Sequence, residues 1–129
     1  GTHDLATLAG WMSGHDLHAK RAIGLGSESD DDRARERNAL QTGLTAYGQD
    51  GGIAAVARFL AQTPSRLVAI SVDDLLGVAD QVNIPGTVEQ HPNWRRKLPV
   101  PLEEWASPLL IVQLVDGLGH LLQQQLNHE

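Results

Sequence analysis

The sequence contains no cysteine, which excludes disulfide bonds, thiolate nucleophiles and cysteine-ligated zinc. This absence fits a reducing compartment, so we expect a cytoplasmic protein. Long hydrophobic runs are also missing, because no apolar stretch reaches the roughly 18 residues that a membrane-spanning helix needs. The first residues do not show the basic and then apolar pattern of a secretory signal. We therefore expect no membrane partner.

Positive charge is scarce as well. Ten lysines and arginines stand against 16 aspartates and glutamates, which gives a formal net charge of −6. Nucleic acids and anionic membrane surfaces attract basic proteins, so this balance argues against both as partners. The cationic cluster at residues 95–97 is too short to reverse it. With 41% hydrophobic and 20% charged residues over 129 positions, the composition is that of one ordinary globular domain.

Apolar residues at three- and four-residue spacing, separated by glycine and proline, predict a mainly helical chain. The expected helices cover residues 5–12, 16–23, 27–47, 53–62, 102–105 and 109–126. Thr2 or Asp4 is the expected N-cap of the first helix, and Ser27 that of the third. Charged residues occupy nearly every face of residues 30–38, so we interpret that stretch as a solvated surface and not as a binding patch.

Residues 67–72 form an apolar run without polar alternation, which is typical of a β-strand buried on both faces. A strand needs a neighbour for its backbone groups. The residues around Thr2 are one expected neighbour, and a second copy of the chain is the other, because an exposed edge allows self-association. The predicted fold class is therefore mainly α with one or two short β-strands. Asp74, just after the strand, is interpreted as a helix cap or structural acid.

Residues 73–101 lack helical or strand periodicity but hold four of the six prolines, unlike a flexible linker. This segment also carries two side-chain amides, Gln81 and Asn83, and the indole of Trp94. Amides donate and accept hydrogen bonds, which suits sugar hydroxyls, and an indole face suits the apolar face of a pyranose. The same amides could instead tether the loop to itself. The residues alone leave both alternatives open.

Other chemistry-bearing residues are sparse. His15 and His18 share a helical face but have no third ligand nearby, so we expect no metal site. Residues 24–27 lack the lysine of a phosphate-binding loop, and we expect no cofactor. The adjacent pair His3 and Asp4 could form part of a site, since a carboxylate orients or charges a neighbouring imidazole. A cap or an ordinary surface pair is the alternative.

Three sequence motifs, taken in order, support one family. They are THD-x-x-T-x-x-GW at residues 2–11, NxPGT at 83–87 and HPNWRR at 91–96. Together they closely resemble the C-terminal part of bacterial 4-α-glucanotransferases, the amylomaltase or disproportionating-enzyme family, over essentially all 129 residues. Ala6 departs from the family, in which proline or asparagine is common there. The resemblance implies that residues 1–129 are a single unit, the C-terminal fragment of a catalytic (β/α)8 (TIM) barrel domain.

The resemblance also implies an activity, the transfer of α-1,4-glucan segments to the 4-position of an acceptor sugar, glucose or a maltooligosaccharide, with retention. The family's nucleophile and acid/base lie in motifs that this sequence lacks. We therefore expect the isolated chain to be inactive and the N-terminal remainder of the barrel to be its partner. Asp4 matches a third carboxylate that stabilises the transition state, and His3 and Asn83 are expected to bind substrate hydroxyls. A non-catalytic helical interaction or sugar-recognition module is the alternative.

Overall fold

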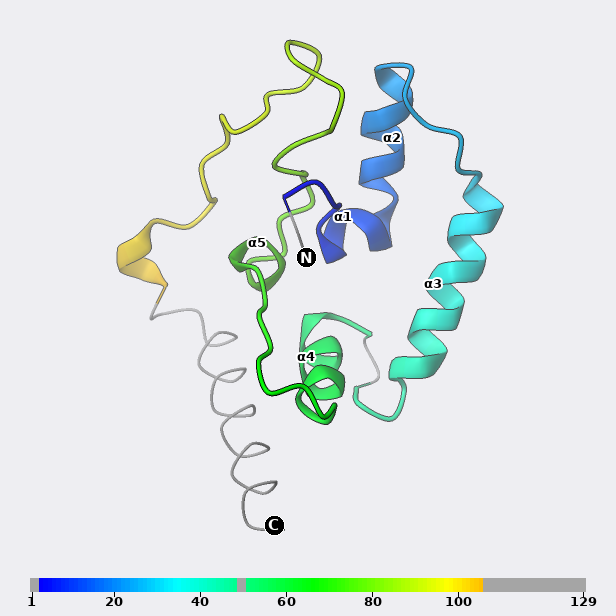
Figure 1. Cartoon of the computed structure of the whole chain (residues 1–129), viewed down its shortest axis with the longest axis vertical. Coiled ribbons are helices and arrows are strands. Elements are labelled where there is room, and N and C mark those ends of the chain that lie inside the picture. The colour runs from blue at the N-terminus through cyan, green and yellow to red at the C-terminus, as the bar shows by residue number, and fades with distance from the viewer. Residues whose placement is uncertain (1–2, 49–50, 106–129) are drawn as a thin grey trace. The chain divides into compact units, whose positions relative to one another are not determined.

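The structure is a computed structural model that describes residues 3–48 and 51–105 (Figure 1). It divides into two compact units. The first unit comprises Gly1–Ala39 and Ser71–Pro99, and the second comprises Leu40–Ile70 and Val100–Glu129. The described helices are α1 (Leu8–Ser13), α2 (His15–Ala22), α3 (Asp30–Leu44), α4 (Ile53–Ala61), α5 (Val72–Leu75) and the 3-10 helix η1 (Leu102–Glu104).

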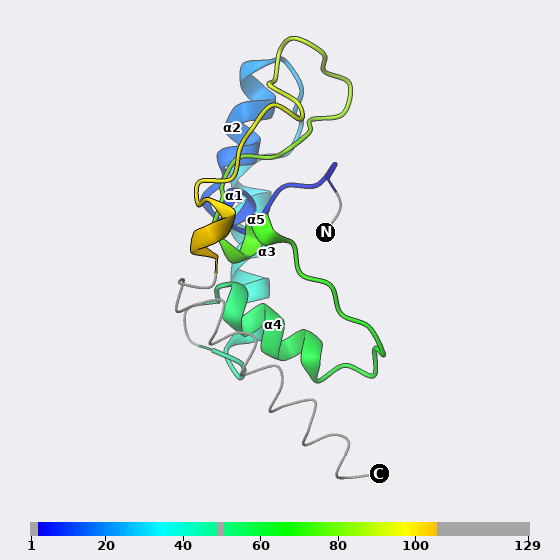
Figure 2. The same cartoon turned by 90° about the vertical axis from the view of Figure 1, so that its left-hand side faces the viewer.

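The described residues contain no β-strand, so the predicted strand at residues 67–72 is wrong. Residues 67–71 are irregular backbone between α4 and α5, as both views show (Figures 1 and 2), and Val72 already belongs to α5. Leu67 is 88% exposed, and none of residues 67–70 makes a backbone hydrogen bond to another described segment. Strand propensity is expressed only where a neighbouring strand pairs with the backbone.

The same finding corrects the predicted fold class. The described part of the chain is helical, and a barrel segment with short β-strands is not present in it. Thr2, one expected strand neighbour, lies outside the described ranges, and the described residues that follow it, 3–7, form no strand. The apolar and β-branched composition of residues 67–72 was a correct observation. Such a composition favours a strand only where a neighbouring strand is present to pair with it, and it is not sufficient to form a sheet.

Helices α1 and α2 lie a few residues from their predicted positions and meet at one glycine. Thr7, and not Thr2 or Asp4, caps α1, because its Oγ1 accepts a hydrogen bond from the Gly10 amide at 3.0 Å. Gly14 ends α1 in the left-handed conformation, with φ 78°, and directly precedes α2. The positive φ at this junction is one that glycine adopts without steric cost.

Helix α3 confirms the third predicted helix with a later start. Ser29, and not Ser27, caps it, since its Oγ accepts a hydrogen bond from the Asp32 amide at 3.1 Å. Three aspartates occupy the first turn, where the helix dipole favours negative charge. They are Asp30, Asp31 and Asp32.

Helix α4 confirms the prediction for residues 53–62 and carries the buried apolar face of the second unit. Gly52 precedes the helix in an extended conformation. The side chain of Phe59 contacts Tyr47 edge to face, with ring centroids 5.4 Å apart. Three small residues of this helix are buried, namely Ala55, Ala57 and Ala61.

The remaining elements are short. Helix α5 was not predicted; Ser71 caps it by accepting from the Asp74 amide at 3.1 Å and donating to the Asp74 carboxylate at 2.7 Å. The helix expected at residues 102–105 is the 3-10 turn η1. The amphipathic helix predicted for residues 109–126 lies outside the described residues.

A buried ion pair joins the helices of the first unit. Arg33 and Asp16 are each 3% exposed, and two guanidinium nitrogens donate to the two carboxylate oxygens of Asp16 at 2.7 and 3.0 Å. Arg33 also donates to the Glu28 carboxylate and to the Trp11 carbonyl, and it lies 4.9 Å from the centre of the Trp11 ring. The interpretation of residues 30–38 as a solvated surface is therefore wrong for Arg33.

The pair shifts the pKa values of both partners. Burial opposes ionisation of the Asp16 carboxyl, but the hydrogen bond from Arg33 and the charges of Arg33 and Lys20 outweigh it and lower its pKa. The hydrogen bond to Asp16 raises the pKa of the Arg33 guanidinium, helped by Glu28 and opposed by burial. Both groups therefore stay charged at neutral pH.

Replacing one partner should be costly. We expect Arg33→Ala to lower the free energy of unfolding by about 3–5 kcal/mol, because Asp16 is left as a buried charge without its main partner. Urea titration followed by circular dichroism measures this. Arg35→Ala is the control on the same helix: Arg35 is 76% exposed and pairs with Asp32, so its loss should cost about 1 kcal/mol or less. Equal midpoints for the two variants would contradict the central role of Arg33.

The lowered pKa of Asp16 also predicts a pH dependence. Because the pKa is lower in the folded state than in the unfolded state, Asp16 contributes stability above its unfolded pKa of about 4. That contribution is lost as the pH falls through the folded pKa. Denaturant midpoints measured from pH 6 downwards should fall more steeply in the wild type than in Asp16→Asn. Parallel curves would show that other carboxylates govern the acid transition.

Candidate functional site

The candidate site is centred on the carboxylate of Asp4. The Asn83 side-chain amide donates to Asp4 Oδ1 at 2.7 Å, although 79 positions separate the two residues. The His3 Nε2 atom lies 3.3 Å from the other oxygen, Oδ2. The side chains of His3 and Asp4 are 55% and 47% exposed. The structure thus brings together the three residues predicted as site residues and leaves them open to a ligand.

Gln81 holds the backbone of both segments in place. Its amide nitrogen donates to the Asp4 carbonyl at 2.9 Å and to the Asn83 carbonyl at 2.6 Å. The carbonyl of Gln81 accepts a hydrogen bond from His91 Nε2 at 2.8 Å, so this ring nitrogen carries the proton. Gln81 and His91 are buried. For Gln81, therefore, the loop-tethering alternative describes the structure.

The oxygen of the Gln81 side chain has no partner. Its Oε1 atom is buried and accepts no hydrogen bond within residues 3–48 and 51–105. The amide cannot be turned around to solve this, because its nitrogen faces two carbonyl oxygens, which only accept. Within the described residues, this buried acceptor is therefore left without a donor, which costs free energy.

The two loop motifs form one hydrogen-bonded unit. Asn93 accepts from the Ile84 amide at 3.0 Å and donates to both the carbonyl and the hydroxyl of Thr87, at 3.0 and 2.8 Å. The Trp94 amide donates to the Val82 carbonyl at 3.1 Å. Side-chain bonds of this kind replace the ladder or helix that the loop lacks. The NxPGT and HPNWRR motifs are therefore two segments of one loop, joined by hydrogen bonds.

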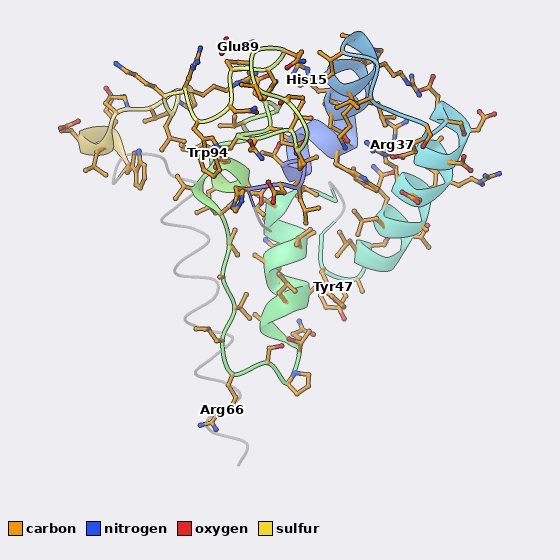
Figure 3. The ribbon with its side chains drawn as sticks, turned by 45° about the horizontal axis from the view of Figure 1, so that its top comes forward. His15, Arg37, Tyr47, Arg66, Glu89 and Trp94 are labelled. Carbon is orange, nitrogen blue, oxygen red and sulfur yellow. The ribbon has the colours of Figure 1, made fainter. Side chains whose placement is uncertain are left out.

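Trp94 projects from this loop beside His3. Figure 3 shows it on the returning arm, past the turn that carries Glu89. Its ring lies 4.9 Å from the His3 ring, tilted by 50°, and the residue is 63% exposed. Its backbone φ is 60°, the only positive value among non-glycine residues of the described chain. The structure therefore places the indole next to the predicted site residues.

Helix α1 is anchored to the segment before the loop, which positions the preceding Asp4. Asp74 accepts a hydrogen bond from the Leu8 amide at 2.6 Å, and the Thr7 hydroxyl donates to the Ala79 carbonyl at 3.4 Å. A Cβ atom on Gly10 would lie 2.3 Å from that carbonyl oxygen, so only glycine permits the contact. Asp74 is thus a structural acid, as one of its two interpretations held.

On the other side of the loop, charged residues pair with one another. Asp80 forms ion pairs with Arg96 and with His15 Nε2, the latter at 2.7 Å. Burial lowers the pKa of the Arg96 guanidinium. His15 therefore contacts the Asp80 carboxylate. Within the described ranges, no group of three or more histidine, cysteine, aspartate or glutamate residues is arranged to hold a metal ion.

The described helices also bear on the membrane question. None of those in residues 3–48 and 51–105 has both the length and the apolar character required to traverse a lipid bilayer.

Sequence reasoning assigned no individual role to His91 and Asn93. Both lie in the HPNWRR motif, which was used as a whole to support the family resemblance. An asparagine next to a bulky residue and opposite a second turn motif is a usable signal, since asparagine side chains commonly bond to backbone groups in turns. The conformation of Trp94 had no such signal, because an αL backbone is favoured by glycine and asparagine and not by tryptophan.

The arrangement has a definite chemical capacity. A carboxylate flanked by an amide and an imidazole offers hydrogen-bond acceptors and donors in a small, open area, which suits adjacent hydroxyl groups. Among the described residues, Asp4 is the only carboxylate bonded to Asn83 or paired with His3. A single carboxylate can stabilise developing positive charge, but covalent retaining chemistry requires two.

Comparison with known proteins agrees with the motifs. The family model described as 4-alpha-glucanotransferase matches residues 1–103. The 4-alpha-glucanotransferases of Mycobacterium tuberculosis (strain H37Rv) and Mycobacterium bovis are each 34% identical over 113 residues, covering 78% of this chain and 16% of the relative. That of Haemophilus influenzae is 26% identical over 122 residues, covering 79% of this chain and 18% of the relative.

The chain thus spans less than a fifth of the length of these curated relatives. The family match extends over well more than half of it, from the THD motif through HPNWRR. The resemblance noted from the motifs is confirmed, and the chain belongs to the 4-alpha-glucanotransferase family.

Proposed function

We propose that this chain supplies part of the donor-sugar site of a 4-alpha-glucanotransferase. The enzyme transfers α-1,4-glucan segments from a maltodextrin to the 4-position of an acceptor, glucose or a maltooligosaccharide, with retention of configuration. In this proposal Asp4 stabilises the transition state, while His3 and Asn83 bind hydroxyls of the donor ring. The nucleophilic carboxylate and the acid/base carboxyl come from the part of the enzyme outside this chain.

The observation that carries the proposal is the contact between Asn83 and Asp4 at 2.7 Å. The two residues belong to different motifs of the same family and have no other reason, from the sequence, to meet. His3 completes the group at 3.3 Å from the same carboxylate. His3 and Asp4 are exposed and Asn83 is partly exposed, so a sugar ring can approach the group from solvent.

The mechanism follows from charge. In a retaining transfer the donor ring becomes positively charged and flattened as its glycosidic bond breaks. A carboxylate that accepts hydrogen bonds from the ring hydroxyls becomes a stronger partner as that charge develops, so it stabilises the transition state more than the ground state. The Asn83 amide holds Asp4 in one orientation and thereby spares the cost of ordering it during the reaction.

The proposal predicts a kinetic effect of Asp4→Asn in the enzyme that carries this chain. Several kcal/mol of transition-state stabilisation correspond to a fall in kcat of roughly 100- to 1000-fold, with a smaller change in KM. Disproportionation of maltotriose, measured by glucose release, gives both constants. Asp31→Asn, an exposed aspartate in the first turn of α3, is the matched control and should leave the rate unchanged. A rate for Asp4→Asn within twofold of the control would exclude the assigned role.

The proposal also predicts that the chain alone is inactive. A retaining transfer cannot proceed without its nucleophile, and the candidate site contains a single carboxylate. Incubation of the isolated chain with maltotriose should therefore release no glucose and form no longer maltodextrins beyond a buffer control. Product above that control would show that the covalent machinery lies within these residues.

A non-catalytic sugar-recognition module is the second candidate, favoured by the same single carboxylate. The reading frame upstream of Gly1 separates the two. Several hundred open codons there support the transferase, and a nearby start codon supports the module.

A further inference from the structure

We propose that Trp94 is a stacking platform for a glucose ring of the bound glucan and thereby contributes to sugar affinity at the Asp4 site. This inference rests on the proposed function, because it adds an apolar contact to a site assigned there to sugar hydroxyls. Four observations support it: the backbone conformation of Trp94, its exposure, the bonds that hold it, and the polar groups around it.

The backbone conformation of Trp94 is unfavourable for its residue type. At φ 60° it occupies the left-handed region, where a bulky L-residue is crowded and glycine or asparagine is favoured. Such a residue persists only where its surroundings hold it, and these conformations cluster at ligand-binding and active sites. A tryptophan whose task was only to fill space would have no need of this position.

The bonds on either side of Trp94 account for its conformation. Its amide donates to the Val82 carbonyl at 3.1 Å. The preceding Asn93 side chain makes three hydrogen bonds, to Ile84 and Thr87. The loop therefore places the indole at a defined point, and it holds the side chain outwards instead of turning it into the core. A preorganised aromatic contact binds at a lower entropic cost than a mobile one.

The indole is available for contact. Trp94 is 63% exposed, whereas Trp11 and Trp105 are partly buried. Trp11 is already covered by the Arg33 guanidinium, and the Trp105 indole nitrogen donates to the Val100 carbonyl. Among the described residues, Trp94 has one aromatic ring contact, with His3 at a tilt of 50°, and its 63% exposure leaves indole surface open.

The polar surroundings fit a pyranose. A glucose ring has an apolar face of C–H groups and a rim of hydroxyls, so it is bound best by an aromatic face next to hydrogen-bonding side chains. His3 lies between the aromatic and the polar groups: its ring centre is 4.9 Å from that of Trp94, and its Nε2 atom is 3.3 Å from Asp4 Oδ2. Asn83 and Asp4 supply a donor and an acceptor beside it.

Titration of the 15N-labelled 129-residue chain with maltose tests the inference. The three tryptophans give three indole N–H signals in the NMR spectrum, and Trp94→Phe and Trp105→Phe assign them. We expect the Trp94 indole signal to shift together with the Asn83 side-chain amide signal, on one binding curve. The indole signals of Trp11 and Trp105 should stay in place. Trp94→Leu should weaken maltose binding on the order of tenfold, and Trp105→Phe should not weaken it.

A second variant separates binding from a structural role. Asparagine tolerates the left-handed conformation, so Trp94→Asn should unfold at a temperature no lower than that of the wild type. Maltose binding should nevertheless be weakened as in Trp94→Leu. Unfolding at a clearly lower temperature, with unchanged maltose affinity in the folded protein, would assign Trp94 to the structure and overturn the inference.

The outcomes distinguish this inference from the proposed function. If the Asn83 and Asp4 signals shift while that of Trp94 does not, the inference fails and the sugar site stands. If none of the three shifts with maltose, the inference fails, while the proposed function is decided separately by the kinetics of Asp4→Asn in the enzyme that carries this chain. If Trp94 shifts and Trp94→Leu binds maltose as well as the wild type does, the indole senses the sugar without contributing to affinity, and the inference fails.

Discussion

The bidentate pair between Arg33 and Asp16 is the interaction on which the first unit depends. Its apolar core is small, since Leu17 and Ile84 are its buried hydrophobic residues within the described ranges. The guanidinium meets the start of α2 through Asp16 and the end of α1 through the Trp11 carbonyl. One residue of α3 thus binds two other helices. Charged hydrogen bonds here hold helices together that a larger core would hold by apolar packing.

The site inherits its position from that network. Asp4 lies just before α1, and α1 is bonded to Asp74 at its first turn and packed against Ala79 at Gly10. The loop then returns to Asp4 through Gln81 and Asn83. Apart from the packing of Gly10 against Ala79, each step is a hydrogen bond of a side chain to backbone or to another side chain. A loop without regular secondary structure is thereby held to a defined geometry, as a site for an oriented ligand requires.

Local signals predicted α1 to α4 and missed α5. Apolar spacing located α4 within one residue at its end, and glycine and serine or threonine marked the neighbourhood of the other starts. The strand failed for a physical reason: residues 67–72 have strand-like composition, but pairing depends on a neighbour that no local pattern can supply. The charge-rich stretch at 30–38 misled in the opposite way. Periodicity and charge do not reveal that Arg33 has two buried acceptors elsewhere in the chain.

The three site residues were found through motif resemblance, and their contact adds what spacing alone could not. Nothing in the residues themselves says that a chain position near the start meets one 79 positions later. The positioning residues His91 and Asn93 were within the quoted motif, yet their function depends on which backbone groups face them. Composition of a loop suggests what it can bind, while its internal hydrogen bonds decide where it binds.

The tether between Gln81 and the main-chain carbonyl of Asp4 has an evolutionary consequence. Every amino acid carries that carbonyl, so the location of position 4 does not depend on which side chain occupies it. Among the described residues, its carboxylate contacts Asn83 and His3. A substitution at position 4 therefore changes the functional group that faces a ligand and leaves the backbone position of the residue unchanged. The loop therefore holds the backbone at position 4 in place whichever side chain evolution selects there.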